Sequence, residues 1–205
     1  MGKRKARNRQ NKSNLIDSRR LTVIATEGSQ TEPKYFDALR QKYRDGNVRV
    51  LRKGTKSALM SVLNRLDKER KPRSGKSEYW AVVDHDRRPI EELGAFAKRA
   101  RSKGYFIADS NPCFELWLIL HFNALNKISG LTGRAEAIGC GSVETTLRQY
   151  DDSFSKSRYD VAKYISRIEQ AISNAKANEA QREVSDSAVG TRVYKLIESI
   201  RNSST

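Results

Sequence analysis

The segment 79–86 reads Tyr-Trp-Ala-Val-Val-Asp-His-Asp, an apolar run that ends in two acidic residues. Its first part, Tyr79 to Val83, is short and rich in β-branched and aromatic residues, which favours a buried strand. A similar run, Leu21 to Ala25, is followed by Thr26, Glu27 and Gly28. Because acidic residues follow both runs, we expect a sheet that carries carboxylates at its strand ends.

On either side of these runs, short apolar segments alternate with segments whose apolar residues have helical spacing. The pattern predicts strands at 21–25, 48–51, 79–83 and 105–108, and helices at 31–43, 58–66 and 89–100. Parallel neighbours need such crossover connections, which are right-handed. We therefore predict an α/β fold with a four-stranded parallel sheet flanked by helices, and a site at the carboxyl ends of the strands.

The pattern becomes helical beyond Asn111. Apolar spacing predicts helices at 114–122, across 161–172 and at 188–200, whereas the glycines between 123 and 142 leave that stretch undecided. We expect three parts: a basic flexible arm (1–18), a catalytic core (19–125) and a mainly helical C-terminal extension packed on the core (126–205).

The chain is strongly basic, with 40 Lys plus Arg against 24 Asp plus Glu and a net charge of +16. Such a charge attracts polyanions, and nucleic acid is the expected partner. The arm lies along phosphates or is a solvated tail that aids solubility. No apolar run approaches the roughly 20 residues of a membrane span, and none follows the basic N-terminus, so we expect a cytoplasmic protein. Cys113 and Cys140 are predicted to be free thiols.

The acidic strand ends predict a metal site. In extended geometry Asp84 and Asp86 face the same way, and Glu27 lies near them if the first and third strands are neighbours. Such oxygen ligands suit Mg²⁺ or Mn²⁺. The alternative is that Asp84 and Asp86 cap the helix near Pro89 and that Glu27 belongs to a capping arrangement with the next helix.

Three segments together resemble the RloB family. They are 26–32 (Thr-Glu-Gly-Ser-Gln-Thr-Glu), 82–86 (Val-Val-Asp-His-Asp) and 110–117 (Ser-Asn-Pro-Cys-Phe-Glu-Leu-Trp), the last followed by His121 and Phe122. RloB-like proteins look like members of the wider TOPRIM group, which has a four-stranded parallel sheet. The resemblance implies metal binding by Glu27, Asp84 and Asp86, a setting in antiphage defence or abortive infection, and an ATPase partner. The sequence has no phosphate-binding loop of its own, so that ATPase is a separate chain.

Glu32 and Glu115 also match the RloB pattern, as further ligands or a general base. Glu32 is otherwise an acid in the first turn of a helix, where the helix dipole favours it. Glu115 stands in an apolar helix and should face either the site or a basic partner. Lys156 stabilises phosphate charge, as lysines do in some related nucleases, or is a solvated surface residue.

The remaining candidates are better explained by packing. His121 is predicted to be a core histidine, and His85 should project away from the aspartates on a strand. The aromatic residues Phe114, Trp117 and Phe122 could stack bases, but their helical spacing favours the core.

These residues support a metal-dependent nuclease that hydrolyses DNA or RNA in antiphage defence. The alternative is a non-catalytic module that binds nucleic acid or an ATPase. Nucleotidyl transfer, as in primases, ranks below both because the chain shows no nucleotide-binding glycine loop.

Overall fold

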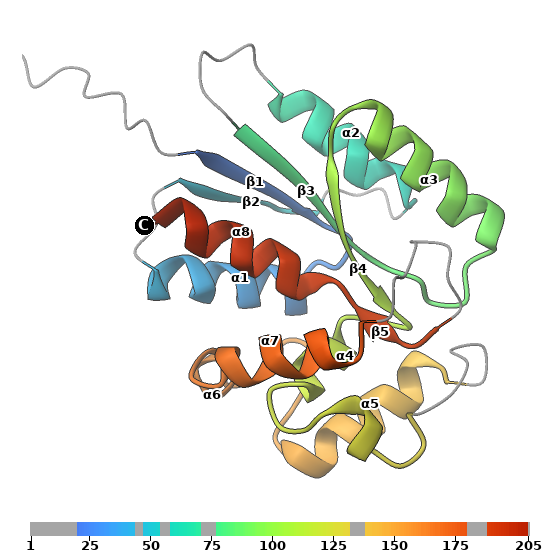
Figure 1. The fold of residues 1–205 in the computed structure, drawn as a ribbon, viewed down its shortest axis with the longest axis vertical. Helices are drawn as coiled ribbons and strands as arrows, with labels where there is room; N and C mark the ends of the chain where they lie inside the picture. The colour runs from blue at the N-terminus through green and yellow to red at the C-terminus, as the bar shows by residue number, and fades with distance from the viewer. Residues whose placement is uncertain are drawn as a thin grey trace, which may run out of the picture.

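The computed structural model describes residues 20–43, 47–53, 58–70, 77–131, 138–179 and 188–204. The predicted basic arm, 1–18, lies outside these ranges. Figure 1 shows a twisted sheet covered by helices on both faces. Its strands lie in the order β2-β1-β3-β4-β5, with bounds β1 Leu21–Thr26, β2 Val48–Leu51, β3 Ser77–Asp84, β4 Phe106–Asn111 and β5 Gly190–Thr191.

The helices follow the strands in the predicted alternation and then continue alone. They are α1 Thr31–Lys42, α2 Met60–Glu69, α3 Ile90–Ser102, α4 Glu115–Ile119, α5 Cys140–Tyr150, α6 Val161–Ile165, α7 Ile168–Ala177 and α8 Val193–Ser204, with a 3₁₀ turn η1 at Leu125–Lys127. Among the described residues, no helix is long and apolar enough to cross a membrane.

β1 lies in the sheet between β2 and β3, and pairs in parallel with both. Thr26 is in register with Val82, so the carboxyl ends of β1 and β3 meet. The neighbour relation on which the predicted site depends is therefore confirmed.

The prediction of a purely parallel four-stranded sheet is wrong at one edge. β5 pairs antiparallel with β4, with Ser110 opposite Thr191 and Asn111 opposite Gly190. A strand of two residues has no periodicity that a sequence pattern could reveal. The apolar spacing predicts this segment as the start of the last helix, which instead begins at Val193.

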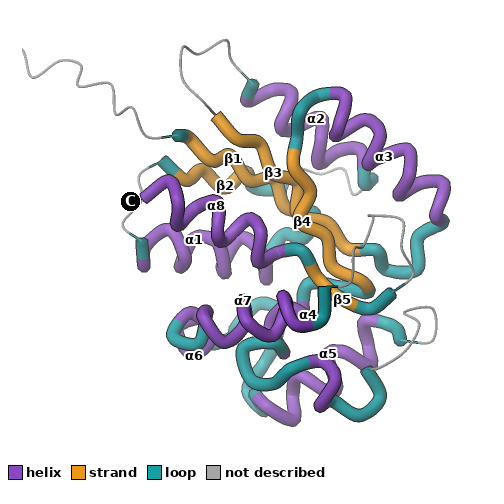
Figure 2. Tube along the Cα trace, in the orientation of Figure 1, coloured by secondary structure: helices purple, strands orange, loops and turns teal. Residues whose placement is uncertain are grey.

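The central strands are buried on both faces, which explains their continuous apolar runs. Ile24 and Val82 belong to one hydrophobic cluster with α1, α4, α7 and α8. Val23 and Ala81 point the other way, into a cluster with α2 and α3. Figure 2 shows these two layers of helices on either side of the strands. The sheet is thus a rigid platform whose carboxyl edge carries the candidate residues.

The helical spacing across 161–172 belongs to two helices instead of one. α6 ends at Ile165 and α7 begins at Ile168, with Arg167 between them at φ −108° and ψ 19°. The apolar residues on both sides of this turn face the same core, so their spacing does not reveal the break. α5 falls partly within the stretch that the sequence pattern left undecided.

Candidate functional site

Glu27 and Asp84 lie side by side at the carboxyl edge of the sheet. Glu27 directly follows β1, and its backbone N–H donates to the Val82 carbonyl at 2.9 Å. Asp84 is the last residue of β3, and its N–H donates to Glu27 Oε2 at 3.2 Å. Two strand ends therefore present carboxylates to one place, as predicted.

Glu32 and Glu115 bring two more carboxylates to this place. Glu32 lies in the first turn of α1 and accepts a hydrogen bond from the Gly28 N–H at 2.7 Å. Glu115 opens α4, and both residues are buried. Both charges act on Asp84 and raise its pKa. We call Glu27, Glu32, Asp84 and Glu115 the acidic cluster.

Gly28 is required by the close approach of Glu32. A Cβ atom at Gly28 would lie 2.0 Å from Glu32 Oε2, which is far inside van der Waals contact. The missing side chain lets the Glu32 carboxylate reach back to the loop after β1. This glycine is therefore part of the local geometry of the acidic cluster.

Two members of the acidic cluster, Asp84 and Glu32, have a raised pKa. Burial raises the pKa of Asp84 well above its usual value, and the charges of Glu32, Glu115 and Glu27 raise it further. Burial also raises the pKa of Glu32, although hydrogen bonds from its own backbone and from Gly28 oppose the shift. Carboxylates in this position are stabilised by a cation.

Asp86 does not share the orientation that an extended strand would impose. β3 ends at Asp84, and Asp86 has a positive φ of 38°. Its N–H donates to the Pro112 carbonyl at 2.9 Å, and its exposed carboxylate accepts from Cys140 Sγ at 3.3 Å. The prediction that strand geometry aligns Asp84 with Asp86 is wrong, because the chain turns between them.

The capping alternative is not supported either. α3 is preceded by Pro89 and α1 by Gln30, and neither of these N-cap residues makes a side-chain capping bond. The carboxylate of Glu27 instead contacts Asp84 and Arg88. The acidic strand ends are therefore not explained by helix capping.

Two basic residues neutralise part of the acidic cluster. Arg88 Nη2 donates to Glu27 Oε1. Lys156 Nζ lies 3.5 Å from Glu115 Oε1 and 2.6 Å from Glu144 Oε1, with half of its side chain exposed. Burial lowers the pKa of Lys156, but the hydrogen bond with Glu144 and the two carboxylate charges outweigh it and raise the pKa.

The sequence pattern leaves Lys156 either near phosphate or on the solvated surface, and it does not indicate Arg88. The contact between Lys156 and Glu115 joins residues far apart in the chain, which no local pattern indicates. For Arg88 the available signal was its position two residues after Asp86, in the turn that leaves β3. Both basic residues belong to the candidate site.

The side chains of the two histidines contact groups outside the acidic cluster. Buried His85 points its Nε2 at Asp109 Oδ2, 3.0 Å away. His121 is buried between Tyr35, whose hydroxyl lies 3.0 Å from Nε2, and the Trp117 carbonyl, 3.0 Å from Nδ1. Burial lowers the pKa of His121 to about 3. The prediction of a core histidine at position 121 is confirmed.

The aromatic residues and cysteines also behave as predicted. Phe114 and Trp117 are buried in the core, and Phe122 stacks on Tyr150 with ring centroids 5.7 Å apart. Cys113 and Cys140 are free thiols. These residues supply packing in place of a base-stacking surface.

The donor set fits a hard divalent cation, although the described side chains are not arranged around one. Within the described ranges, no group of three or more His, Cys, Asp or Glu is placed to hold a metal ion. Arg88 and the Asp84 N–H engage Glu27, and Lys156 engages Glu115. Carboxylate oxygens are nevertheless the ligands that Mg²⁺ or Mn²⁺ would take. Glu27 and Asp84 are the residues best placed to hold it.

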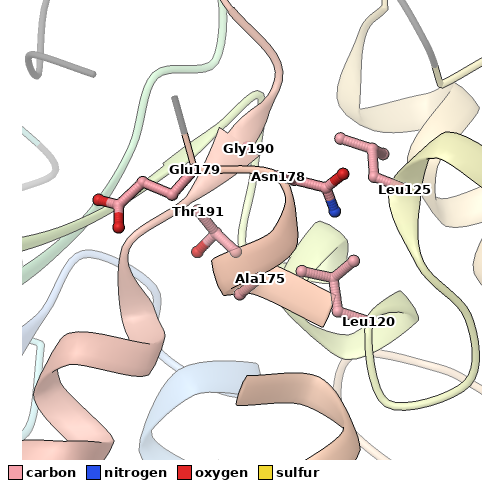
Figure 3. Close-up of a pocket in the computed structure, with 7 residues that line it drawn as sticks. All are labelled: Leu120, Leu125, Ala175, Asn178, Glu179, Gly190 and Thr191. Atoms are coloured by element: carbon pink, nitrogen blue, oxygen red, sulfur yellow. The ribbon is translucent and has the colours of Figure 1, made fainter. Parts of the chain in front are cut away.

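A small cavity elsewhere does not compete as a substrate site. It lies between α4, α7 and β5, and its volume of about 10 Å³ admits about one water molecule. Figure 3 shows the apolar side chains of Leu120 and Leu125 near Asn178, while Glu179 points away. No member of the acidic cluster lines it.

The fold and the site together define a mostly parallel α/β protein that gathers carboxylates at the carboxyl edge of its sheet. The chain belongs to the RloB-like protein family, whose model matches residues 22–200. The matched range includes the acidic cluster, Asp86, Arg88 and Lys156. No curated protein and no solved structure matches the chain.

Proposed function

We propose that this protein is a metal-dependent nuclease that hydrolyses phosphodiester bonds of DNA or RNA. The observation that carries the proposal is the meeting of four carboxylates from β1, α1, β3 and α4, where burial and mutual repulsion raise the pKa of Asp84. Glu27, Asp84 and Asp86 hold Mg²⁺ or Mn²⁺. Asp86 contributes from the exposed turn at the edge of the acidic cluster.

The residues around the metal have separate roles. The bound cation supplies charge stabilisation for phosphate and lowers the pKa of water. Glu32 or Glu115 accepts a proton, since both are buried beside Asp84. Lys156, half exposed beside Glu115, neutralises phosphate charge.

The family relationship supports the wider setting of this proposal. RloB-like membership favours a TOPRIM-like core and a role in antiphage defence or abortive infection, with a separate ATPase chain as partner, in the cytoplasm. The net charge of +16 supports nucleic acid as the substrate.

A cleavage assay tests the proposed activity. Purified protein is incubated with single-stranded DNA, duplex DNA and transfer RNA, with Mg²⁺, with Mn²⁺ or with a chelator. We expect cleavage with metal that Asp84→Ala abolishes and that Glu91→Gln, at an exposed acid on α3, retains. Full metal-dependent cleavage by Asp84→Ala would contradict the proposal.

A binding module is the second candidate. It is favoured by the ion pairs of Arg88 with Glu27 and of Lys156 with Glu115, which balance two of the carboxylates without a metal. This candidate predicts salt-sensitive binding of nucleic acid that does not depend on Asp84. Fluorescence anisotropy with labelled nucleic acid at several salt concentrations separates the two candidates.

A further inference from the structure

Arg88 bridges two acids that have different positions relative to the site. Its Nη2 donates to Glu27 Oε1 in the acidic cluster, and its Nη1 lies 3.2 Å from Glu92 Oε1 on α3. Glu27 has 15% of its side chain exposed, whereas Glu92 has 40%. One guanidinium therefore connects an inner carboxylate with an outer one.

Lys156 repeats this arrangement at another member of the acidic cluster. It bridges the inner Glu115, whose side chain is 4% exposed, and the outer Glu144 on α5, which is 22% exposed. Lys156 lies closer to its outer acid, at 2.6 Å, than to its inner acid, at 3.5 Å. Arg88 instead donates a hydrogen bond directly to its inner acid, so it occupies an oxygen that a metal ion would need.

Both oxygens of Glu27 are already engaged. Oε1 accepts from Arg88, and Oε2 accepts from the Asp84 N–H at 3.2 Å. A divalent cation at Glu27 would stand next to the guanidinium, and two like charges at one carboxylate repel. A cation and Arg88 therefore compete for Glu27.

The turn does not need this side chain to hold its shape. The Arg88 N–H donates to the His85 carbonyl at 2.7 Å, and the Asp86 N–H donates to the Pro112 carbonyl at 2.9 Å. These backbone bonds fix the chain between β3 and α3 independently of the guanidinium. The Arg88 guanidinium can therefore leave Glu27 without disturbing the turn.

We infer that Arg88 is a built-in counter-ion of Glu27, which a divalent cation displaces, and that Glu92 is its second binding partner. When the cation binds, Arg88 releases Glu27 and stays paired with Glu92. Its freed Nη2 then faces the edge of the acidic cluster, where a substrate phosphate takes the place of the carboxylate. The inference rests on the proposed metal site.

The chain offers matched controls for each residue of this exchange. Arg87 precedes Arg88 and carries the same charge, but it is exposed and lies beside Gly139. Glu91 precedes Glu92 and is exposed in the first turn of α3. A substitution at the neighbouring residue removes the same charge without removing the contact. A difference in cation affinity between the two variants of a pair therefore measures the effect of the contact itself.

The experiment measures Mn²⁺ binding to the full chain by titration calorimetry, without nucleic acid. We expect Arg88→Gln to bind Mn²⁺ about tenfold more tightly than Arg87→Gln, since the competing guanidinium is gone. We expect Glu92→Gln to bind more weakly than Glu91→Gln, because Arg88 then has no second partner. Equal affinities of Arg88→Gln and Arg87→Gln would overturn the inference.

An Asp84→Asn variant separates failure of this inference from failure of the metal site. Loss of Mn²⁺ binding in Asp84→Asn supports the metal site, and the Arg88 comparison then decides the inference. Unchanged binding in Asp84→Asn removes the metal site and the inference with it. If Arg88→Gln does not fold, Arg88→Lys replaces it with Arg87→Lys as its control, because a lysine offers one ammonium group in place of a planar fork of five donors and so holds Glu27 less firmly.

Discussion

The backbone N–H of Asp84 donates a hydrogen bond to Glu27 Oε2 at 3.2 Å, across a separation of 57 residues in the chain. This bond ties the end of β3 to the residue that follows β1. It exists because the two strands are parallel neighbours whose carboxyl ends meet at Thr26 and Val82. The orientation of Glu27 is therefore set by the sheet as well as by its ion pair with Arg88.

Asp84→Asn should stabilise the metal-free protein at neutral pH. The pKa of Asp84 is raised in the folded state, so its contribution to stability is present below the unfolded value of 3.8 and is lost as pH rises through the folded value. Removing the charge should therefore increase the free energy of unfolding at pH 7. Urea denaturation in the presence of a chelator measures this. Asp152→Asn, at an exposed position, is the control and should change little.

Divalent cations should stabilise the wild-type protein and leave Asp84→Asn unaffected. A ligand that binds only the folded state adds about 2.7 kcal/mol at a concentration of 100 times its Kd. Thermal denaturation with increasing Mn²⁺ should show a rising Tm for the wild type alone. An equal rise in both proteins would mean that the cation binds elsewhere.

Gly28→Ala should disturb the acidic cluster. The new Cβ atom would lie 2.0 Å from Glu32 Oε2, so the Glu32 carboxylate must leave the Gly28 N–H. We expect a loss of about 1–3 kcal/mol in the free energy of unfolding, because a buried polar contact is broken. Urea denaturation gives this value directly.

Gly94→Ala is the matched control for that substitution. Gly94 lies inside α3, and a Cβ atom there would meet nothing within 4 Å. Alanine should raise the free energy of unfolding by up to about 1 kcal/mol through helix propensity. Destabilisation by both alanines would show that the steric argument at Gly28 is incorrect.

His121 should make the protein sensitive to acid. Its pKa is lowered to about 3 in the folded state, whereas the unfolded value is 6.5. Below pH 6.5 His121 is protonated in the unfolded chain but stays neutral in the folded protein. This difference lowers the free energy of unfolding by about 1.4 kcal/mol per pH unit. Above pH 6.5 both states are neutral and the contribution of His121 is flat.

The measurement compares wild type with His121→Gln in urea between pH 7.5 and pH 5. The difference in free energy of unfolding between the two proteins should narrow as pH falls, because the variant lacks the proton uptake while all other groups cancel. A constant difference across this range would refute the assignment of His121 as a buried neutral histidine.

Local sequence was enough to predict the parallel part of the sheet. Strands such as 79–83 are buried on both faces and therefore read as unbroken apolar runs, and the helices between them keep one apolar side. The expectation that Glu27 and Asp84 meet followed from the rule that parallel strands end at the same edge. The edge strand β5 was not predicted, because a strand of two residues is too short to show a periodic pattern.

The sequence by itself determined which residues form the sheet and that carboxylates stand at its carboxyl edge, since these depend on periodicity and neighbouring residues. Only the tertiary structure decided the rest. Asp86 lies in a turn outside β3, where its backbone adopts a positive φ. Arg88 and Lys156 reach Glu27 and Glu115 from distant parts of the chain. Such contacts depend on how the helices pack against the sheet, which local spacing does not encode.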